Sequence, residues 1–236
     1  MENVVLGAYW WDRKESVEQC AERVVGCLRD FGQCDPALSR WFRGGRSRKE
    51  ALEREVQITS DAVKELLLRG RNRKDIGGEV IEDLGFSLRL WNGGEDCQDV
   101  GFSVTCGGHA ANPNIWNSCV VELPSEGPPS ERMLKVDPLL CLMRAVVTAF
   151  DPDWATVMPD SLRQIANFGW ANKPAVGWLF YAANRVLPSP RIPAVARVVS
   201  IPNRGSIAVV TEERFSPDRP EHLQVREAVQ AAIVAR

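Results

Sequence analysis

Three short apolar runs in the middle of the chain, separated by strong turn formers, constrain the fold more than any other feature of the sequence. The runs cover residues 84–91, 100–106 and 115–123. Asn-Gly-Gly-Glu-Asp at 92–96 joins the first two runs, and a segment rich in Gly, Ala and Asn at 107–113 joins the last two. Because such short connections bring consecutive strands back beside each other, the runs predict antiparallel β-strands.

The flanking segments predict an α+β fold, mainly antiparallel sheet flanked by helices. A strand is expected at 4–11, and Ser16 with Gln19 fits a capping box that opens a helix, which Gly32 can end. The further elements expected in this part of the chain are helices at 48–55 and 61–69, a Pro/Ser/Glu-rich loop at 124–130, and a helix that begins at Glu131 or Asp137 and ends at Phe150.

The last third of the chain repeats this order of elements in a shorter form. After Asp151-Pro152-Asp153 we expect a strand at 154–158, a helix at 161–167, strands at 176–181, 194–201 and 206–211, and a helix at 221–235. Both parts thus follow the order strand, helix, three strands, helix, although no sequence repeat accompanies it. We expect one domain over 1–236, with 1–150 and 151–236 as possible topologically similar halves.

The cysteines and the N-terminal segment predict the cellular compartment in which the protein resides. The chain has seven cysteines, an odd number, and its N-terminus lacks the basic start and apolar stretch of a signal peptide. No apolar run reaches the roughly 18 residues that span a bilayer. We therefore expect a cytoplasmic protein, not membrane-bound, with reduced cysteines. Cys20 and Cys27 lie on one face of the first helix, which favours core packing over metal binding, since both histidines are distant and there is no C-x-x-C motif.

Two opposed charge blocks lie behind the near-neutral net charge of −2. Residues 40–74 carry eleven Arg or Lys against five Asp or Glu, whereas residues 75–131 carry ten acids against Arg89 alone. Since a fold does not require such segregation, we interpret the acidic block as a surface that attracts basic proteins and repels nucleic acid. Solvated loops between strands are the alternative. The acids expected at turns and strand ends, exposed together, are Glu95, Asp96, Asp99, Glu122 and Glu126.

The sequence offers few residues for catalysis. Cys106 and His109 could form a nucleophile pair, but they lie in the acidic block, whereas an activated thiolate needs an electropositive setting. The acids between Glu95 and Asp99 could hold a divalent metal, but they lack the spacing of a calcium loop. No glycine pair belongs to a phosphate-binding motif, and the basic run at 69–74 could either touch phosphate or bond to helix ends and acidic strands. We expect no catalytic residue, metal or cofactor; a small hydrolase or metal-dependent nuclease built on these groups is the alternative.

Short motifs along residues 6–93 resemble a known protein family. They are Gly-Ala-Tyr-Trp at 7–10 with Arg13, Asp35-Pro36 with Trp41, the dense stretch 66–75, and two runs at 84–87 and 90–93. In this order and spacing they resemble the immunity protein 52 family of bacterial polymorphic-toxin systems. The motif residues, which suit fold maintenance more than an interface, are Gly7, Tyr9, Trp10, Trp41, Gly70, Arg71, Asn72, Gly85, Phe86, Trp91 and Asn92.

The resemblance implies a cytoplasmic antidote that binds and neutralises a cognate toxin and has no activity of its own. For this family the implied toxin is a nuclease of the restriction-endonuclease type, often delivered by type VI secretion. An acidic surface would suit a nuclease cleft, which is basic because it grips phosphates. Inhibition would then occlude the toxin's active site or a surface that the toxin needs. A structural partner in a secretion apparatus is a third possibility.

Overall fold

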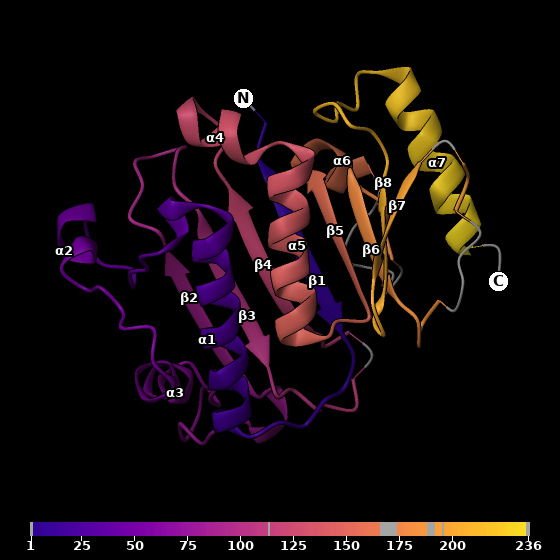
Figure 1. The fold of residues 1–236 in the computed structure, drawn as a ribbon. Helices are drawn as coiled ribbons and strands as arrows, with labels where there is room; N and C mark the ends of the chain where they lie inside the picture. The colour runs from indigo at the N-terminus through magenta and orange to yellow at the C-terminus, as the bar shows by residue number, and fades with distance from the viewer. Residues whose placement is uncertain (1, 113, 166–173, 188–191, 195, 235–236) are drawn as a thin grey trace.

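One eight-stranded antiparallel sheet runs through the whole chain (Figure 1). The structure is a computed structural model and describes residues 2–112, 114–165, 174–187, 192–194 and 196–234. The strands follow the order β2-β3-β4-β1-β5-β6-β8-β7. The strands are β1 Val4–Trp10, β2 Phe86–Trp91, β3 Gly101–Cys106, β4 Asn117–Leu123, β5 Trp154–Pro159, β6 Leu179–Ala183, β7 Arg197–Ile201 and β8 Gly205–Val209. The prediction of an α+β fold with antiparallel pairing is confirmed.

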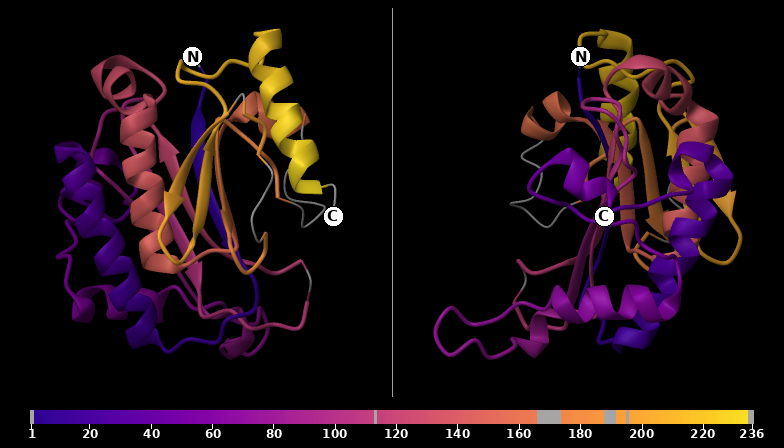
Figure 2. Two further views of the ribbon diagram at one scale, coloured as in Figure 1. Left: turned by 45° about the vertical axis from the view of Figure 1, so that its right-hand side comes forward. Right: turned by 90° about the vertical axis from the view of Figure 1, so that its left-hand side faces the viewer.

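The helices gather mainly on one side of this sheet (Figures 1 and 2). They are α1 Val17–Cys34, α2 Arg48–Leu52, α3 Ser60–Arg69, α4 Gly127–Met133, α5 Val136–Phe150, α6 Asp160–Ile165 and α7 Pro220–Val234. The predicted capping box opens α1, with the Ser16 hydroxyl accepting from the Gln19 N–H and the Gln19 side chain accepting from the Ser16 N–H. Within the described ranges, no helix is both long and apolar enough to cross a membrane.

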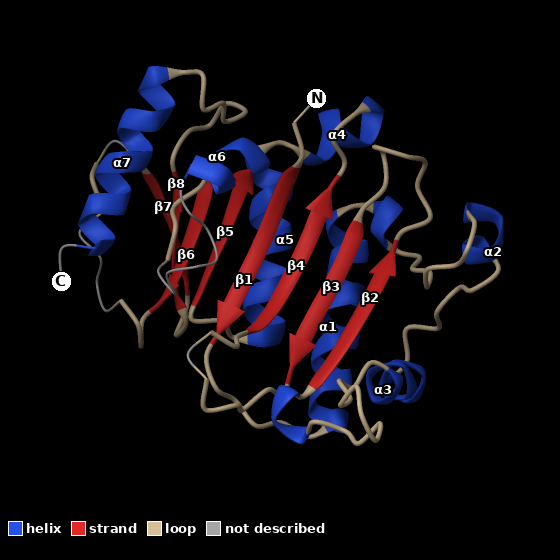
Figure 3. Cartoon of the chain, turned by 180° about the vertical axis from the view of Figure 1, so that it is seen from behind, coloured by secondary structure: helices blue, strands red, loops and turns tan. Residues whose placement is uncertain are grey.

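The two faces of the sheet differ in what covers them. Alternate residues of β1, such as Leu6 and Trp10, are fully buried under the helices, and the Trp10 ring stacks on Phe150 of α5 at 5.4 Å. The opposite face of β2, β3 and β4 lies behind the helices and is half-buried or exposed (Figure 3). We call this surface the open face; its residues on those strands are Ser87, Arg89, Trp91, Gly101, Ser103, Thr105, Ser118, Val120 and Glu122.

The two parts of the chain share an order of elements but not a topology. In the first part β1 pairs with the last strand of its meander, β4, whereas β5 pairs with the first strand that follows it, β6. The remaining strands then lie in the order β6-β8-β7 rather than in sequence order. Because β1 pairs directly with β5, both parts belong to one continuous sheet.

The helix expected near residue 131 differs from the structure. Of the two predicted starts, Asp137 is close to the observed one, because α5 begins at Val136. The segment expected to be a loop is instead largely helical, because α4 occupies much of it. Pro128 and Pro129 lie in the first turn of α4, where proline's missing N–H costs nothing and its fixed φ suits a helix. The prolines therefore begin a helix here.

The C-terminal end of α5 is held by arginine side chains from four parts of the chain. The last carbonyls of a helix have no partner within it and carry the negative end of its dipole, so guanidinium groups stabilise them. Arg13 donates to the Phe150 and Asp151 carbonyls at 2.5 and 2.7 Å, and Arg23 to the Ala149 carbonyl at 2.7 Å. The C-terminal part of the chain contributes Arg185, 2.7 Å from the Asp151 carbonyl, and Arg204, 3.2 Å from the Val147 carbonyl.

The expectation that every cysteine is reduced is wrong for one pair. Cys34, at the end of α1, forms a disulfide with Cys141 of α5, with a Cα–Cα distance of 5.7 Å and a sequence separation of 107. Spacing in sequence could not reveal this pair, because it depends on how α1 packs beside α5. Cys20 and Cys27 are buried, as expected, among the apolar side chains of the core.

We predict that the disulfide contributes substantially to stability. In the chain-entropy model, cross-linking residues this far apart stabilises a protein by about 3–5 kcal/mol. The double variant Cys34→Ser/Cys141→Ser should therefore unfold at a clearly lower urea concentration than the oxidised parent, and adding a reductant should bring the parent to the same midpoint. Cys97→Ser, at an exposed free cysteine, is the control. Equal midpoints for the parent with and without reductant would contradict the prediction.

Candidate functional site

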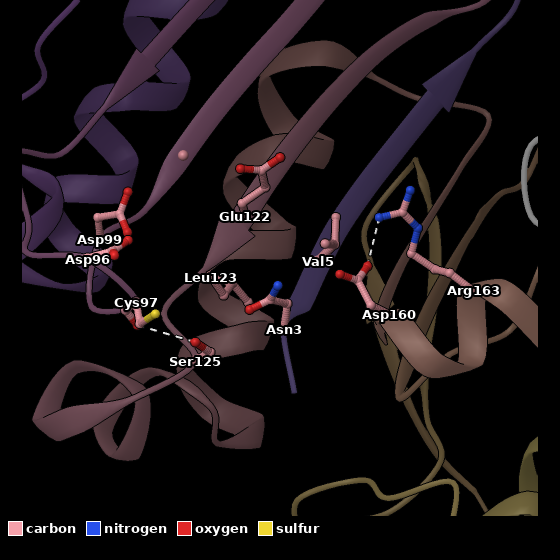
Figure 4. Close-up of a pocket in the computed structure, with 11 residues that line it drawn as sticks. Asn3, Val5, Asp96, Cys97, Asp99, Glu122, Leu123, Ser125, Asp160 and Arg163 are labelled. Atoms are coloured by element: carbon pink, nitrogen blue, oxygen red, sulfur yellow. Dashed lines mark hydrogen bonds and ion pairs between the residues drawn. The ribbon is translucent and has the colours of Figure 1, made fainter. Parts of the chain in front are cut away.

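An acidic pocket of about 330 Å³ lies at one end of the open face. It forms where β1 and β3 begin and where β4 ends, and α6 closes its far side (Figure 4). Four carboxylates line it, from the β2–β3 loop, from β4 and from α6. They are Asp96, Asp99, Glu122 and Asp160. The segments that meet here lie as far apart in sequence as Asn3 and Arg163, a separation of 160 residues, and the sheet brings them together.

Local backbone chemistry fixes the acids of the β2–β3 loop. The Asn92 side-chain oxygen accepts from the Gly94 and Val100 N–H groups at 3.2 and 2.8 Å, which closes the loop across its base. A side chain at Gly94 would place its Cβ 2.6 Å from the Cα of Asp99. The tight turn therefore requires glycine at that position, and it brings Asp99 to the pocket.

A second glycine makes room for Glu122. Gly101 faces Glu122 across the β3–β4 pair, and a Cβ at Gly101 would come 2.9 Å from a Glu122 carboxylate oxygen. The Glu122 side chain consequently lies over bare backbone on the open face, toward the pocket (Figure 4). A larger residue at position 101 would displace this carboxylate.

The pocket keeps a negative charge. Arg163 of α6 pairs with Asp160 at 2.9 Å, whereas Asp96, Asp99 and Glu122 form no ion pair among the residues that the structure describes. Burial, and secondarily the nearby Asp96 carboxylate, raises the pKa of Asp99 above its usual value of 3.8. A pocket with these groups would be stabilised by a lysine or arginine side chain from another molecule, because the cation offsets both the burial and the repulsion.

The structure brings together three of the five predicted acids. Asp96, Asp99 and Glu122 line the pocket, while Glu95 lines a neighbouring hollow with Asn92 and Gln98. Glu126 is exposed just before α4, and its N–H donates to the Cys97 carbonyl at 3.0 Å. Asp160 and Arg163 were not expected at the site. Their place depends on the pairing of β1 with β5, which no local pattern reveals.

The first family motif lies on β1, the strand beside β4 in the sheet. Gly7 and Tyr9 lie on the same side of β1, and a Cβ at Gly7 would come 2.5 Å from the Tyr9 hydroxyl oxygen. The Tyr9 ring therefore lies along the strand over Gly7 and stacks on Trp154 with the centroids 4.5 Å apart. Burial raises the pKa of Tyr9 to about 12. Gly7 thus makes room for the Tyr9 ring on the side of β1 opposite to Trp10, which fills the core.

The second family motif builds the start of β2. Gly70 packs so closely that a Cβ would lie 1.8 Å from the Ser87 carbonyl oxygen, and Gly85 has a φ of +65°, which favours glycine. Arg71 lies over the Phe86 ring at 5.5 Å and pairs with Glu82. The Asn72 carbonyl accepts from Ile81 at 2.9 Å. These contacts all lie within the chain, between the segment after α3 and the start of β2.

The remaining motif residues also make structural contacts. The fully buried Trp41 donates its indole N–H to the Leu38 carbonyl at 2.9 Å. Trp91 is half-buried, with its ring 6.2 Å from that of Phe42. Part of the basic run pairs with neighbouring acids, for example Lys74 with Glu79 at 2.7 Å. The opposed charge blocks thus partly neutralise each other. The acids of the pocket therefore indicate a candidate binding surface better than the acidic block as a whole does.

The proposed nucleophile pair has an unfavourable geometry. Cys106 is fully buried, its thiol contacts that of Cys20, and this contact together with burial raises its pKa well above the usual value. A thiol held protonated is a poor nucleophile. His109 lies in the following loop, with Nδ1 3.1 Å from the Gly107 carbonyl oxygen. Within the described part of the chain, no group of three or more His, Cys, Asp or Glu residues is arranged to hold a metal ion.

The raised pKa of Asp99 predicts that this carboxylate lowers stability. The folded protein binds the Asp99 proton at higher pH than the unfolded chain does, so the group stabilises the fold in acid and loses that contribution as the pH rises through the folded pKa. Asp99→Asn should therefore slightly raise the free energy of unfolding at about pH 7 and change it little at about pH 3. Urea unfolding at both pH values measures this, with the exposed Asp218→Asn as the control. A variant less stable than the parent at neutral pH would contradict the assignment.

Comparisons with known proteins agree with the motifs. In the solved structures, the fold is similar to a Pseudomonas aeruginosa T6SS protein, PA0821, with a TM-score of 0.53 and 11% sequence identity, over 98% of this chain and 73% of that one. No curated protein sequence matches the chain. The family model described as immunity protein 52 matches residues 2–235, which is nearly the whole chain. The chain therefore belongs to the immunity protein 52 family.

Proposed function

We propose that the chain is an antidote that binds a cognate nuclease toxin with its open face and neutralises it by covering the active site or another surface that the toxin needs. The observation that carries this proposal is the pocket, in which Asp96, Asp99 and Glu122 gather on a sheet face that the helices leave uncovered. Membership of an immunity-protein family supplies the class of partner.

The charge of the pocket supports a nuclease as that partner. A nuclease binds phosphates with lysine and arginine side chains, so its cleft is positively charged before substrate arrives. A negative pocket on the antidote attracts such a cleft over a distance and speeds association. Once bound, the antidote occupies the space that nucleic acid would take, and its own acids replace the phosphates.

The proposal also covers the delivery of the toxin and the compartment of the antidote. The likeness to a T6SS protein supports a toxin delivered by type VI secretion. A nuclease attacks nucleic acid in the cytoplasm, so we place the antidote there. The Cys34–Cys141 disulfide is more typical of oxidising compartments. Counting alkylatable thiols in protein taken directly from cells distinguishes the two compartments, since the reduced chain exposes two more cysteines on unfolding.

Neutralising the pocket should slow association with the toxin. The variant Asp96→Asn/Asp99→Asn/Glu122→Gln keeps side-chain shape but removes three charges, so the association rate should fall by about tenfold at low salt. The difference from the parent should shrink as salt rises, because exposed charges are screened. The matched control is Glu22→Gln/Glu53→Gln/Asp218→Asn, which removes three exposed charges elsewhere. Equal association rates for the two variants would remove the pocket from the interface.

Neutralisation should require one antidote per toxin. Occlusion consumes the inhibitor, whereas an enzyme would act in trace amounts. Titrating purified protein against a fixed amount of toxin should give a linear loss of nuclease activity that ends near equal concentrations. His109→Ala should behave like the parent, and Cys106→Ser should do so provided that it folds, because Cys106 is buried. Complete neutralisation by a small fraction of the toxin concentration would revive the enzyme alternative.

A further inference from the structure

A projecting hairpin arm, residues 71–81, leaves the body of the protein between α3 and β2. Its two sides are joined by backbone hydrogen bonds from Ile81 to Asn72 and from Lys74 to Glu79, both 2.9 Å long. The Lys74 ammonium group also pairs with the Glu79 carboxylate at 2.7 Å, and Arg73 donates to the Gly78 carbonyl at 2.9 Å. The arm is therefore an ordered structure that is held in shape before any partner binds.

The tip of the arm presents an apolar side chain to solvent. Ile76 is 91% exposed, the most exposed of the large apolar residues in the described chain. Gly77 and Gly78 follow it with φ values of +88° and +66°, and a Cβ at either would meet nothing within 4 Å. The glycines turn the chain sharply just after Ile76 and leave the space around it open. A polar side chain would form hydrogen bonds with water at this turn, whereas an exposed isoleucine side chain is hydrated unfavourably.

The arm projects toward the side of the sheet opposite to α1 and α5. In the right-hand view of Figure 2 the helices α1 and α5 lie on one side of the sheet, and the segment that follows α3 extends to the other side at its lower rim. The same rim carries Trp11, directly after β1, and Trp116, directly before β4. Their rings meet edge to face at 4.7 Å, and Trp11 is 38% exposed.

The open face is thus chemically different at its two ends. The end where β1 begins holds the acidic pocket, and the end where β1 finishes holds Trp11 and the arm. A strand of seven residues separates them, which corresponds to roughly 20 Å at about 3.3 Å per residue. This span lies within one protein–protein interface of standard size, which buries about 800 Å² on each partner.

We propose that Ile76 and Trp11 are the apolar anchors of the interface whose charged end is the acidic pocket. The occupant is the same toxin, so this inference rests on the proposed function: a protein surface with basic groups at one end and an apolar hollow for Ile76 at the other. Continuity of the rim with the open face supports a single occupant. Charges steer the encounter, whereas buried apolar anchors at the interface slow dissociation.

The test separates the two ends of the interface by their kinetics. Ile76→Asp puts a charge where an apolar contact is expected, and the exposed turn should tolerate it without loss of fold. Toxin dissociation should become about tenfold faster or more, with the association rate little changed. Val186→Asp, at another exposed apolar residue (46% exposed), is the matched control. The pocket variant described above should instead change the association rate, so combining it with Ile76→Asp should give both effects.

Each other outcome overturns a distinct statement. If the parent does not bind toxin, the proposed function fails and the arm has no partner. If the parent binds, the pocket variant weakens binding, and Ile76→Asp matches Val186→Asp, then the arm proposal alone fails. Light scattering without toxin tests a second copy of the chain as the occupant. If the parent is a dimer and Ile76→Asp is a monomer, the arm binds another copy and not the toxin. If the parent binds anionic vesicles and Ile76→Asp does not, the occupant of the arm is a lipid surface and not the toxin.

Discussion

The rest of the structure depends on the capped C-terminal end of α5. Four arginines, two from the first 23 residues and two from beyond residue 180, donate to the last carbonyls of this helix or to Asp151 directly after it. Burial disfavours the charged form of Arg13 and lowers its pKa, but the helix end and the Asp151 side chain supply the compensating negative charge. This cluster joins parts of the chain that are distant in sequence, and it fixes α5 above β1, next to which the candidate site is built.

Local features of the sequence predicted the elements well and their arrangement poorly. The capping box at Ser16, the turn at Asn92-Gly93 and the short runs that became β2, β3 and β4 all have local causes, namely side-chain capping and glycine-rich turns. The sheet order has no such cause. The pairing of β1 with β5 and the crossing of β8 between β6 and β7 depend on packing between residues far apart. The disulfide escaped prediction for the same reason.

The candidate site was predictable where charge alone defined it. Segregation of acids between residues 75 and 131 indicated Asp96, Asp99 and Glu122, and three-dimensional proximity then separated these from Glu95 and Glu126. Asp160 came from outside the acidic block. The family motifs, by contrast, identified the chain through residues that shape its backbone, such as Gly70 beneath Ser87 and Gly7 beneath Tyr9. These glycines make close backbone approaches that only a residue without a Cβ allows.

The central position of β1 has a consequence for how the chain is made. β1 precedes the other seven strands of the sheet in the chain, yet its partners are β4 and β5, more than a hundred residues later. Until a ribosome has produced residue 159, one or both edges of this apolar strand have no partner, and contacts of such sequence separation form slowly. The centre of the sheet therefore closes only after the chain has been made as far as Pro159, the partner of Val4.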